Sequence, residues 1–370
     1  MIAVDKQDHV RLARLARRSV AIIEANQAST GAYLASPNFV VYRYSWFRDG
    51  AFIADAMSRA GRPESAERFF AWCNRVLVAR AAKIASLLER RAARLPIAAD
   101  EFLPCRYTVD GEDVGEDWWE FQLDGYGTWL WAVGEHAARH GASVLPYREG
   151  AELTVAYLAA FWDEPCYDWW EENPTERHTS TLAALFGGLT AAARWEMLAP
   201  EVCELAGRTA RDIRARVLAE GARGGRLVKW LDGDALDASL ITCATPFGLV
   251  AGDEPHMKNT IAALESSLAH GGVHRYAADT YFGGGEWPLL SALLGWHYAE
   301  TGRAADALAQ LLWVADQADE NGELPEQVDG HLLAPAFRRQ WIERWGPVAS
   351  PLLWSHAMFL TLACELGVLE

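Results

Sequence analysis

Two glutamates of this chain lie in surroundings that suit the two halves of an acid–base reaction. Glu171 lies in the run YDWWEENPTERH (167–178), directly after two tryptophans. A carboxyl group against indole rings loses hydration, which raises its pKa toward the range where it donates a proton near neutral pH. Glu326 lies in the run NGELPEQVD (321–329) beside Gln327. Polar neighbours of this kind keep a carboxylate ionised, which suits a general base.

Cleavage of a glycosidic bond needs such a complementary pair. One carboxylic acid protonates the leaving oxygen, while one carboxylate holds water on the opposite face of the sugar. Inverting enzymes keep the two groups about 6.5 to 9.5 Å apart to leave room for that water. The residues alone leave a second interpretation of Glu171 open, because a Trp-Glu-Glu run before a helix is also the pattern of a solvated acidic cap.

Two further segments carry side chains suited to a neutral polyol. The run YRYSWFRD (42–49) places an arginine fork beside a carboxylate that could grip adjacent hydroxyls, with a tryptophan as a flat platform. The run HRYAADTYFGGGEW (274–287) offers a similar set around a triple glycine. Both arginine–aspartate pairs are also compatible with purely structural ion pairs. The candidate residues are Trp46, Arg48 and Asp49 in the first run, and Arg275, Asp279, Tyr281 and Trp287 in the second.

Other kinds of catalytic site lack support in the sequence. The triple glycine is not followed by the lysine and Ser/Thr of a phosphate loop, and neither a G-x-S-x-G motif nor a dinucleotide fingerprint is present. The ten histidines form no H-E-x-x-H motif, and the six cysteines form no C-x-x-C pair. We therefore expect no metal and no cofactor.

Charge and composition limit the partners that the chain can have. A formal net charge of -16 repels nucleic acid and anionic membranes. Seventeen tryptophans, many of them in Gly- and Asp-rich segments, suit the apolar faces of sugar rings, although each could also fill the core. Charges interrupt the N-terminal apolar residues, and no later stretch approaches 18 charge-free apolar residues. We therefore expect a cytoplasmic protein that binds a small sugar.

Apolar residues at helical spacing predict about a dozen helices and almost no strands, apart from a short one at 224–231. Tight breaks such as Gly61–Arg62–Pro63 make neighbouring helices antiparallel. Six such hairpins predict one closed all-α toroid over residues 1–370, with the candidate residues in the longer loops. The expected helices cover 8–26, 48–61, 64–92, 124–141, 147–162, 178–194, 199–220, 234–241, 255–269, 287–301, 303–317 and 348–366, and the loops cover 28–47, 98–123, 163–177, 270–286 and 318–347.

Over most of its length the chain resembles glycoside hydrolase family 15, the glucoamylases and their bacterial relatives. Five segments match the family in order, and the resemblance implies an (α/α)6 barrel. The chain shows no sequence for the β-sandwich or starch-binding module that other members carry, so we expect a single catalytic domain. The matching segments are Y-x-x-S-W-x-R-D at 42–49, D-W-W-E-F-Q-L-D-G-Y-G at 117–127, W-E-E at 170–172, R-Y-A-A-D-T-Y with Trp287 at 275–287, and L-P-E-Q at 324–327 followed by P-L-L-W-S at 351–355.

The resemblance implies a role for each matching residue. It makes Glu171 the general acid and Glu326 the general base, and it places Glu172 against the second sugar. It further implies that Tyr42 lies near the attacking water, and we expect Tyr281 to hold Tyr42 through a hydroxyl contact. The resemblance also implies that Arg48, Asp49 and Arg275 bind the terminal glucose and that Trp46, Trp118, Trp170, Trp287 and Trp354 line the pocket.

The expected activity is an inverting exo-α-glucosidase that releases β-D-glucose. A bare barrel without a polymer-binding module suits short sugars, so isomaltose and short isomalto-oligosaccharides are the first choice of substrate. An α-1,4-glucosidase acting on maltose or maltooligosaccharides, and an enzyme for another α-glucoside such as trehalose, remain open. Two more distant alternatives are a sugar-binding barrel, which has no need of both glutamates, and an epimerase or lyase on the same fold.

Overall fold

The computed structural model describes residues 5–115 and 118–369, and the regular secondary structure within them is almost all helical. Its α-helices are α1 (Lys6–Ala25), α2 (Phe47–Arg59), α3 (Pro63–Ala79), α4 (Ala81–Ala92), α5 (Asp124–His140), α6 (Arg148–Phe161), α7 (Thr179–Ala192), α8 (Pro200–Glu220), α9 (Pro255–Ser267), α10 (Pro288–Glu300), α11 (Ala304–Asp316), α12 (Arg338–Trp345) and α13 (Leu353–Glu365). The 3-10 helices are η1 (Val40–Tyr42), η2 (Ala99–Glu101), η3 (Leu145–Tyr147), η4 (Ala238–Cys243), η5 (Tyr281–Gly283) and η6 (Pro335–Phe337). Two antiparallel pairs of short strands complete the chain, β1 (Ser45–Trp46) with β2 (Arg106–Tyr107) and β3 (Ala222–Arg223) with β4 (Arg226–Leu227).

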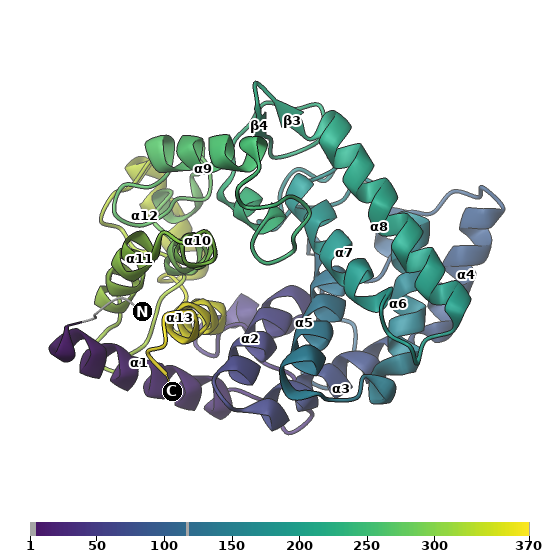
Figure 1. Ribbon diagram of the computed structural model, residues 1–370, viewed down its shortest axis with the longest axis horizontal. Coiled ribbons are helices and arrows are strands. Elements are labelled where there is room, and N and C mark those ends of the chain that lie inside the picture. Colours follow the sequence, from purple (N-terminus) through teal and green to yellow (C-terminus); the bar gives the residue numbers. More distant parts are fainter. Residues whose placement is uncertain (1–4, 116–117, 370) are drawn as a thin grey trace.

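The helices form two concentric rings, seen end-on in Figure 1. The inner ring closes through successive contacts of α2 with α5, α5 with α7, α7 with η4, η4 with α10, α10 with α13, and α13 with α2. Each inner element is backed by one outer helix: α3 behind α2, α6 behind α5, α8 behind α7, α9 behind η4, α11 behind α10 and α1 behind α13. The predicted all-α (α/α)6 barrel is therefore confirmed.

Local sequence explains where these helices begin and end. A proline occupies the first turn of α3, α8, α9 and α10, where its missing N–H costs nothing. Gly141 ends α5 in the left-handed conformation, which a glycine adopts without strain. Inner helices are covered by their ring neighbours and by the outer helices, and α10 is buried without interruption from Pro288 to Tyr298.

Two inner helices, α5 and α7, approach closely at a pair of glycines. A Cβ atom at Gly188 would overlap the carbonyl oxygen of Gly127. We expect Gly188→Ala to lower the free energy of unfolding by about 1–3 kcal/mol, because the overlapping atom belongs to the backbone and cannot turn away. Gly207→Ala on α8 is the control, since its nearest atom is the end of an arginine side chain 3.5 Å away. Urea unfolding that found the two variants equally stable would contradict this packing.

The structure corrects several predicted boundaries. The predicted helix 64–92 is two helices, because the chain leaves helical geometry at Arg80, whose guanidinium donates to Gly111 O at 2.9 Å. The predicted inner helix 234–241 is the 3-10 helix η4, and the predicted strand 224–231 is the hairpin of β3 and β4. The loop 318–347 contains a helix, α12, that was not predicted.

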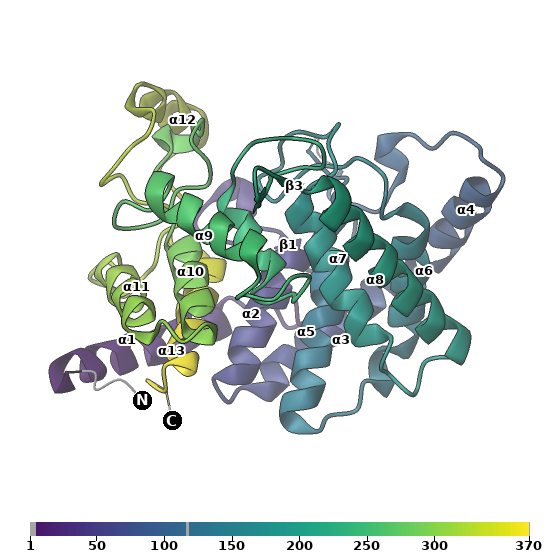
Figure 2. The same ribbon diagram turned by 45° about the horizontal axis from the view of Figure 1, so that its top comes forward.

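Helix α12 stands at the end of the barrel away from both chain termini (Figure 2). None of its residues is fully buried, and its apolar residues Trp341, Ile342 and Trp345 are only partly buried, so its apolar pattern was too short to predict the helix. Within the described residues, no helix is both long enough and apolar enough to cross a membrane.

Candidate active site

A cavity of about 530 Å³ lies where several inner helices begin. Thirteen of the fourteen residues proposed from the sequence for catalysis or sugar binding line it, which brings together loops far apart in the chain. These are Tyr42, Trp46, Arg48, Asp49, Trp118, Trp170, Glu171, Glu172, Arg275, Tyr281, Trp287, Glu326 and Trp354. The exception is Asp279, which is buried behind the cavity wall in an ion pair with Arg275. Asp117, the first residue of one matching segment, lies outside the described residues.

Glu171 lies at the tip of a tight turn between α6 and α7. Its backbone φ is 64°, a left-handed conformation that is uncommon for a residue with a side chain. The Asp168 carboxylate closes the turn by accepting from the backbone N–H groups of Trp170 and Glu172, both at 2.9 Å. The Trp46 indole donates to Glu171 Oε1 at 2.9 Å. The glutamate is thus held at both its backbone and its side chain.

Burial raises the pKa of Glu171 above its ordinary value. The positive charge of Arg48 and the hydrogen bond from Trp46 act against this shift without cancelling it. The direction agrees with the prediction from the neighbouring indole rings. A carboxyl group with a raised pKa keeps its proton to higher pH and can donate it to a leaving oxygen.

Glu326 is buried, and its two oxygens have different surroundings. Oε1 accepts a hydrogen bond of 2.9 Å from the Tyr42 hydroxyl. The Tyr42 and Tyr281 hydroxyls lie 3.0 Å apart, so the predicted contact between the two tyrosines is confirmed. Among the described residues, Oε2 has no hydrogen-bond partner. A carboxylate oxygen left free on a cavity wall can accept a proton from a small molecule in that cavity.

The pKa of Glu326 corrects the prediction that polar neighbours keep this group ionised. Burial raises the pKa to about 8, and it outweighs the lowering by the Tyr42 hydrogen bond and by the charge of Arg275. The neighbour Gln327 instead accepts from the Gly285 backbone N–H at 2.9 Å. The raised pKa makes the ionised group a stronger proton acceptor, although it is ionised in fewer molecules at neutral pH.

One short segment supplies a donor to each carboxylate. Tyr42 belongs to η1 and Trp46 to β1, and their rings meet edge to face with centroids 5.7 Å apart. Pairing of β1 with β2 fixes this segment, with Trp46 opposite Arg106. A displacement of the segment would therefore disturb Glu171 and Glu326 together.

Arg48 and Asp49 lie in the first turn of α2. Arg48 Nη1 donates to Gln122 at 2.8 Å and to Asp124 at 3.1 Å, while its Nε lies 3.4 Å from Asp49 Oδ2. The interpretation as a structural ion pair is therefore correct in part. However, Arg48 Nε and Asp49 Oδ2 make no hydrogen bond within the described part of the chain. Burial raises the pKa of Asp49 to about 6 despite the neighbouring Arg48.

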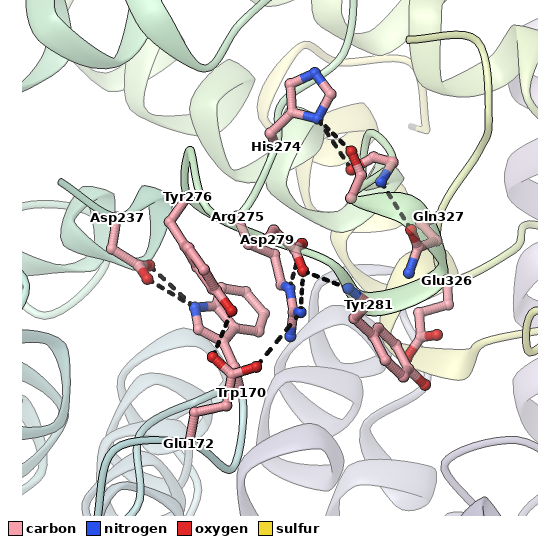
Figure 3. A network of polar contacts seen from close by, with 12 residues as sticks. Trp170, Glu172, Asp237, His274, Arg275, Tyr276, Asp279, Tyr281, Glu326 and Gln327 are labelled. Carbon is pink, nitrogen blue, oxygen red and sulfur yellow. Dashed lines mark hydrogen bonds and ion pairs between the residues drawn. The ribbon is translucent and has the colours of Figure 1, made fainter. Parts of the chain in front are cut away.

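A second arginine, Arg275, also lines the cavity and is fixed by its neighbours (Figure 3). Arg275 donates to both oxygens of Asp279, at 2.8 and 2.5 Å. Its Nη2 also lies 3.8 Å from Glu172 Oε1, and Tyr276 donates to the other oxygen of Glu172 at 2.5 Å. Ionic and hydrogen-bonding groups are thus fixed before any ligand binds, which lowers the entropic cost of binding.

Sequence reasoning missed an aromatic wall on one side of the cavity. Trp341 and Trp345 of α12 both line the cavity, and the Trp345 ring lies 6.4 Å from that of Trp118. Arg344 lies over both tryptophans of α12, at 5.5 and 4.8 Å from their centres. The spacing of two tryptophans four residues apart was the available signal, because it places both on one face of a helix.

Removing the Tyr42 hydroxyl tests how the second carboxylate is held. We expect Tyr42→Phe to lower kcat/KM for a glycoside substrate by about 100-fold or more, because Glu326 loses its hydrogen-bond donor. The rise of activity with pH should also move to higher pH, since this bond lowers the pKa of Glu326 and a base acts only when ionised. Tyr281→Phe, which leaves that bond in place, should have a smaller effect. An unchanged pH profile in Tyr42→Phe would argue against the arrangement.

Comparison with known proteins identifies the family. Residues 13–321 match Glycosyl hydrolases family 15, a segment that includes Glu171 and ends before Glu326. Isomaltose glucohydrolase of Kribbella flavida is 50% identical over 370 residues, which cover 99% of this chain and 96% of that protein. A solved wild-type glycosidase superimposes with a TM-score of 0.97 at 49% identity, over 100% of both chains. Another, a variant in complex with glucose, superimposes equally well at 48% identity.

A more distant structure shares the fold. The glucoamylase from Saccharomycopsis fibuligera superimposes with a TM-score of 0.71 over 99% of this chain and 96% of that one, at 14% identity. The match over most of the length and the relative with half of its residues identical agree with the barrel. The chain is a glycoside hydrolase and belongs to glycosyl hydrolases family 15.

Proposed function

We propose that the chain is an inverting exo-α-glucosidase that releases β-D-glucose from the non-reducing end of isomaltose and short isomalto-oligosaccharides. One observation carries the chemistry: two carboxyl groups with raised pKa values line one cavity, and each accepts a hydrogen bond from a different aromatic residue of one segment. The relative from Kribbella flavida, an isomaltose glucohydrolase, supports the choice of substrate.

The proposed reaction is a single displacement. Glu171 gives its proton to the glycosidic oxygen as the bond between that oxygen and C1 breaks. Glu326 takes a proton from a water molecule, whose oxygen forms a new bond to C1 on the opposite face of the sugar. The leaving sugar departs as an alcohol, and the configuration at C1 changes from α to β. Proton exchange with solvent then returns both glutamates to their starting states.

We assign the remaining polar residues of the cavity to sugar binding. Arg48 Nε and Asp49 Oδ2 form an ion pair at 3.4 Å but make no hydrogen bond among the described residues, and they suit two adjacent hydroxyls of the terminal glucose. Arg275 suits a further hydroxyl of that glucose, and Glu172 suits the second sugar. The tryptophan rings supply flat apolar faces for the sugar rings. The residues assigned to this role are Trp46, Trp118, Trp170, Trp287 and Trp354, with Tyr42 and Tyr281 beside the attacking water.

The linkage is tested by comparing disaccharides that differ only in the bond between two glucose units. We expect kcat/KM to be highest for isomaltose, lower for maltose and lowest for trehalose, measured as glucose release by the same enzyme preparation. A preference for maltose would replace the α-1,6 assignment by the α-1,4 alternative without changing the mechanism. If the protein hydrolysed none of the three disaccharides, only the sugar-binding and non-hydrolytic alternatives would remain.

We also propose that residues 1–370 form one catalytic domain that acts in the cytoplasm on a small sugar. Closure of the inner ring by α13 against α2, with α1 behind α13, supports a single domain. All six cysteines are free thiols, which suits a reducing compartment. A single cooperative unfolding transition, and retained activity under reducing conditions, are the expected results.

A further inference from the structure

Lys229 is a buried lysine held between two buried carboxylates. It lies in the segment after β4, and only 4% of its surface is exposed. Its ammonium group lies 3.1 Å from Asp168 Oδ2 and 2.9 Å from Asp237 Oδ2. Lys229 does not line the cavity. A buried charge of this kind needs close partners, and removal of one partner is costly.

Both carboxylates that contact Lys229 also hold the turn that carries Glu171. Asp168 accepts from the backbone N–H groups on either side of Glu171, those of Trp170 and Glu172, at 2.9 Å each. Asp237 accepts from the Trp170 indole N–H, at 3.1 and 2.9 Å to its two oxygens (Figure 3). The turn 168–172 is therefore held at its backbone by one partner of Lys229 and at a side chain by the other.

These bonds hold Glu171 in an unfavourable backbone conformation. A non-glycine residue with φ of 64° has a strained backbone, which persists only where its surroundings hold it. Asp168 can accept these bonds fully only as a carboxylate. The charges of Lys229 and His178 lower its pKa despite its burial, so it stays ionised. Without the ammonium group, two buried carboxylates would face each other.

Lys229 also contacts Tyr276, which in turn donates to Glu172, the residue assigned to the second sugar in the proposed function. Its ammonium lies 4.1 Å from the centre of the Tyr276 ring, a cation–π contact. The hydroxyl of Tyr276 donates to Glu172 at 2.5 Å. The same lysine thus connects the turn 168–172 with the segment that begins at Arg275.

We propose that Lys229 is a positioning residue for the acid step: it holds Asp168 and Asp237, which fix the turn that presents Glu171 to the leaving oxygen. The proposal rests on the proposed function, in which Glu171 is the general acid. It predicts that replacing Lys229 lowers kcat most for substrates whose leaving group needs protonation.

The test is Lys229→Met, which keeps the length and apolar stem of the side chain and removes its charge. We expect kcat for isomaltose to fall by about 10- to 100-fold, because even a small displacement of the Glu171 carboxyl group slows proton transfer strongly. For α-D-glucosyl fluoride we expect a change of no more than about threefold, because fluoride departs with little help from an acid. Lys258→Met, at an exposed position of α9, is the matched control and should leave both rates unchanged.

A second variant keeps the proposal testable if Lys229→Met alone does not fold. Lys229→Met combined with Asp237→Asn removes one positive and one negative charge, so the net charge of the buried cluster is unchanged. The asparagine keeps an oxygen that can accept from the Trp170 indole. We expect this double variant to show the same selective loss on isomaltose, with a thermal unfolding transition nearer to that of the unmodified enzyme.

Equal losses on isomaltose and on the fluoride would overturn the proposal, since they would show general damage to the cavity, and so would wild-type rates on both. Glu171→Gln is the reference for the selective pattern. If Glu171→Gln itself lacks that pattern, the part of the proposed function that makes Glu171 the general acid is wrong. If Glu171→Gln shows it and the lysine variants do not, only the role of Lys229 is wrong.

Discussion

Replacing Glu326 by glutamine is expected to lower kcat for isomaltose by about 1,000-fold or more without loss of the fold. The amide cannot take a proton from water, and a positioned general base contributes about 100- to 10,000-fold to such reactions. The side chain keeps its shape, and its oxygen can still accept from the Tyr42 hydroxyl. The loss should be similar for α-D-glucosyl fluoride, because attack by water is needed whichever group leaves.

The same substitution should stabilise the protein at neutral pH. Burial raises the pKa of Glu326 to about 8 in the folded protein, so the folded state favours its protonated form. The cost of ionising this buried group begins as pH rises above the pKa of the unfolded chain and is complete above the folded pKa. Glu326→Gln should therefore unfold at a higher temperature than the unmodified enzyme at pH 8, with a smaller difference at pH 4. Glu320→Gln, at an exposed position of the same loop, is the control. Near-normal activity in Glu326→Gln would remove this residue from the mechanism.

Glu171→Gln is expected to lower kcat for isomaltose by about 1,000-fold or more, but to lower kcat for α-D-glucosyl fluoride far less. A glutamine keeps an acceptor for the Trp46 indole but has no proton to give to the glycosidic oxygen. In the unmodified enzyme, activity should fall as pH rises through the raised pKa of Glu171, because the acid acts only when protonated. This alkaline fall should disappear in the variant when the fluoride is the substrate.

Glu176→Gln is the matched control for Glu171→Gln, because Glu176 lies in the same acidic run and does not line the cavity. Its rates on both substrates should be normal. A Glu171→Gln enzyme that lost both activities equally would show that Glu171 binds or orders the site. The general acid would then have to be another group in the cavity.

Much of the fold follows from local sequence. The inner helix α10 is a mostly apolar run with a proline in the first turn, and both signals lie within the helix itself. The break at Arg80 was not predictable, because it involves a bond to Gly111 of a distant loop. Helix α12 was missed because it is short and none of its residues is fully buried, so its periodic signal is limited to the four-residue spacing of Trp341 and Trp345.

The site, like the fold, has parts that could be predicted from the sequence and parts that could not. Residues that face the cavity belong to recognisable motifs, so Glu171 and Glu326 could be proposed together from the sequence. The residues behind them could not, since Lys229 meets Asp168 only in the folded chain. The pKa of Glu326 was misjudged for a related reason, because its burial is set by distant segments and not by Gln327.

Proton NMR of the anomeric signals during the first minutes of isomaltose hydrolysis tests the two-glutamate inverting mechanism most directly. The released glucose should appear first as the β-anomer, and the α-anomer should grow in only as mutarotation proceeds, because water attacks C1 from the face opposite the leaving sugar. Initial release of α-glucose would contradict the mechanism, since it would require a second displacement at C1 and a different role for Glu326.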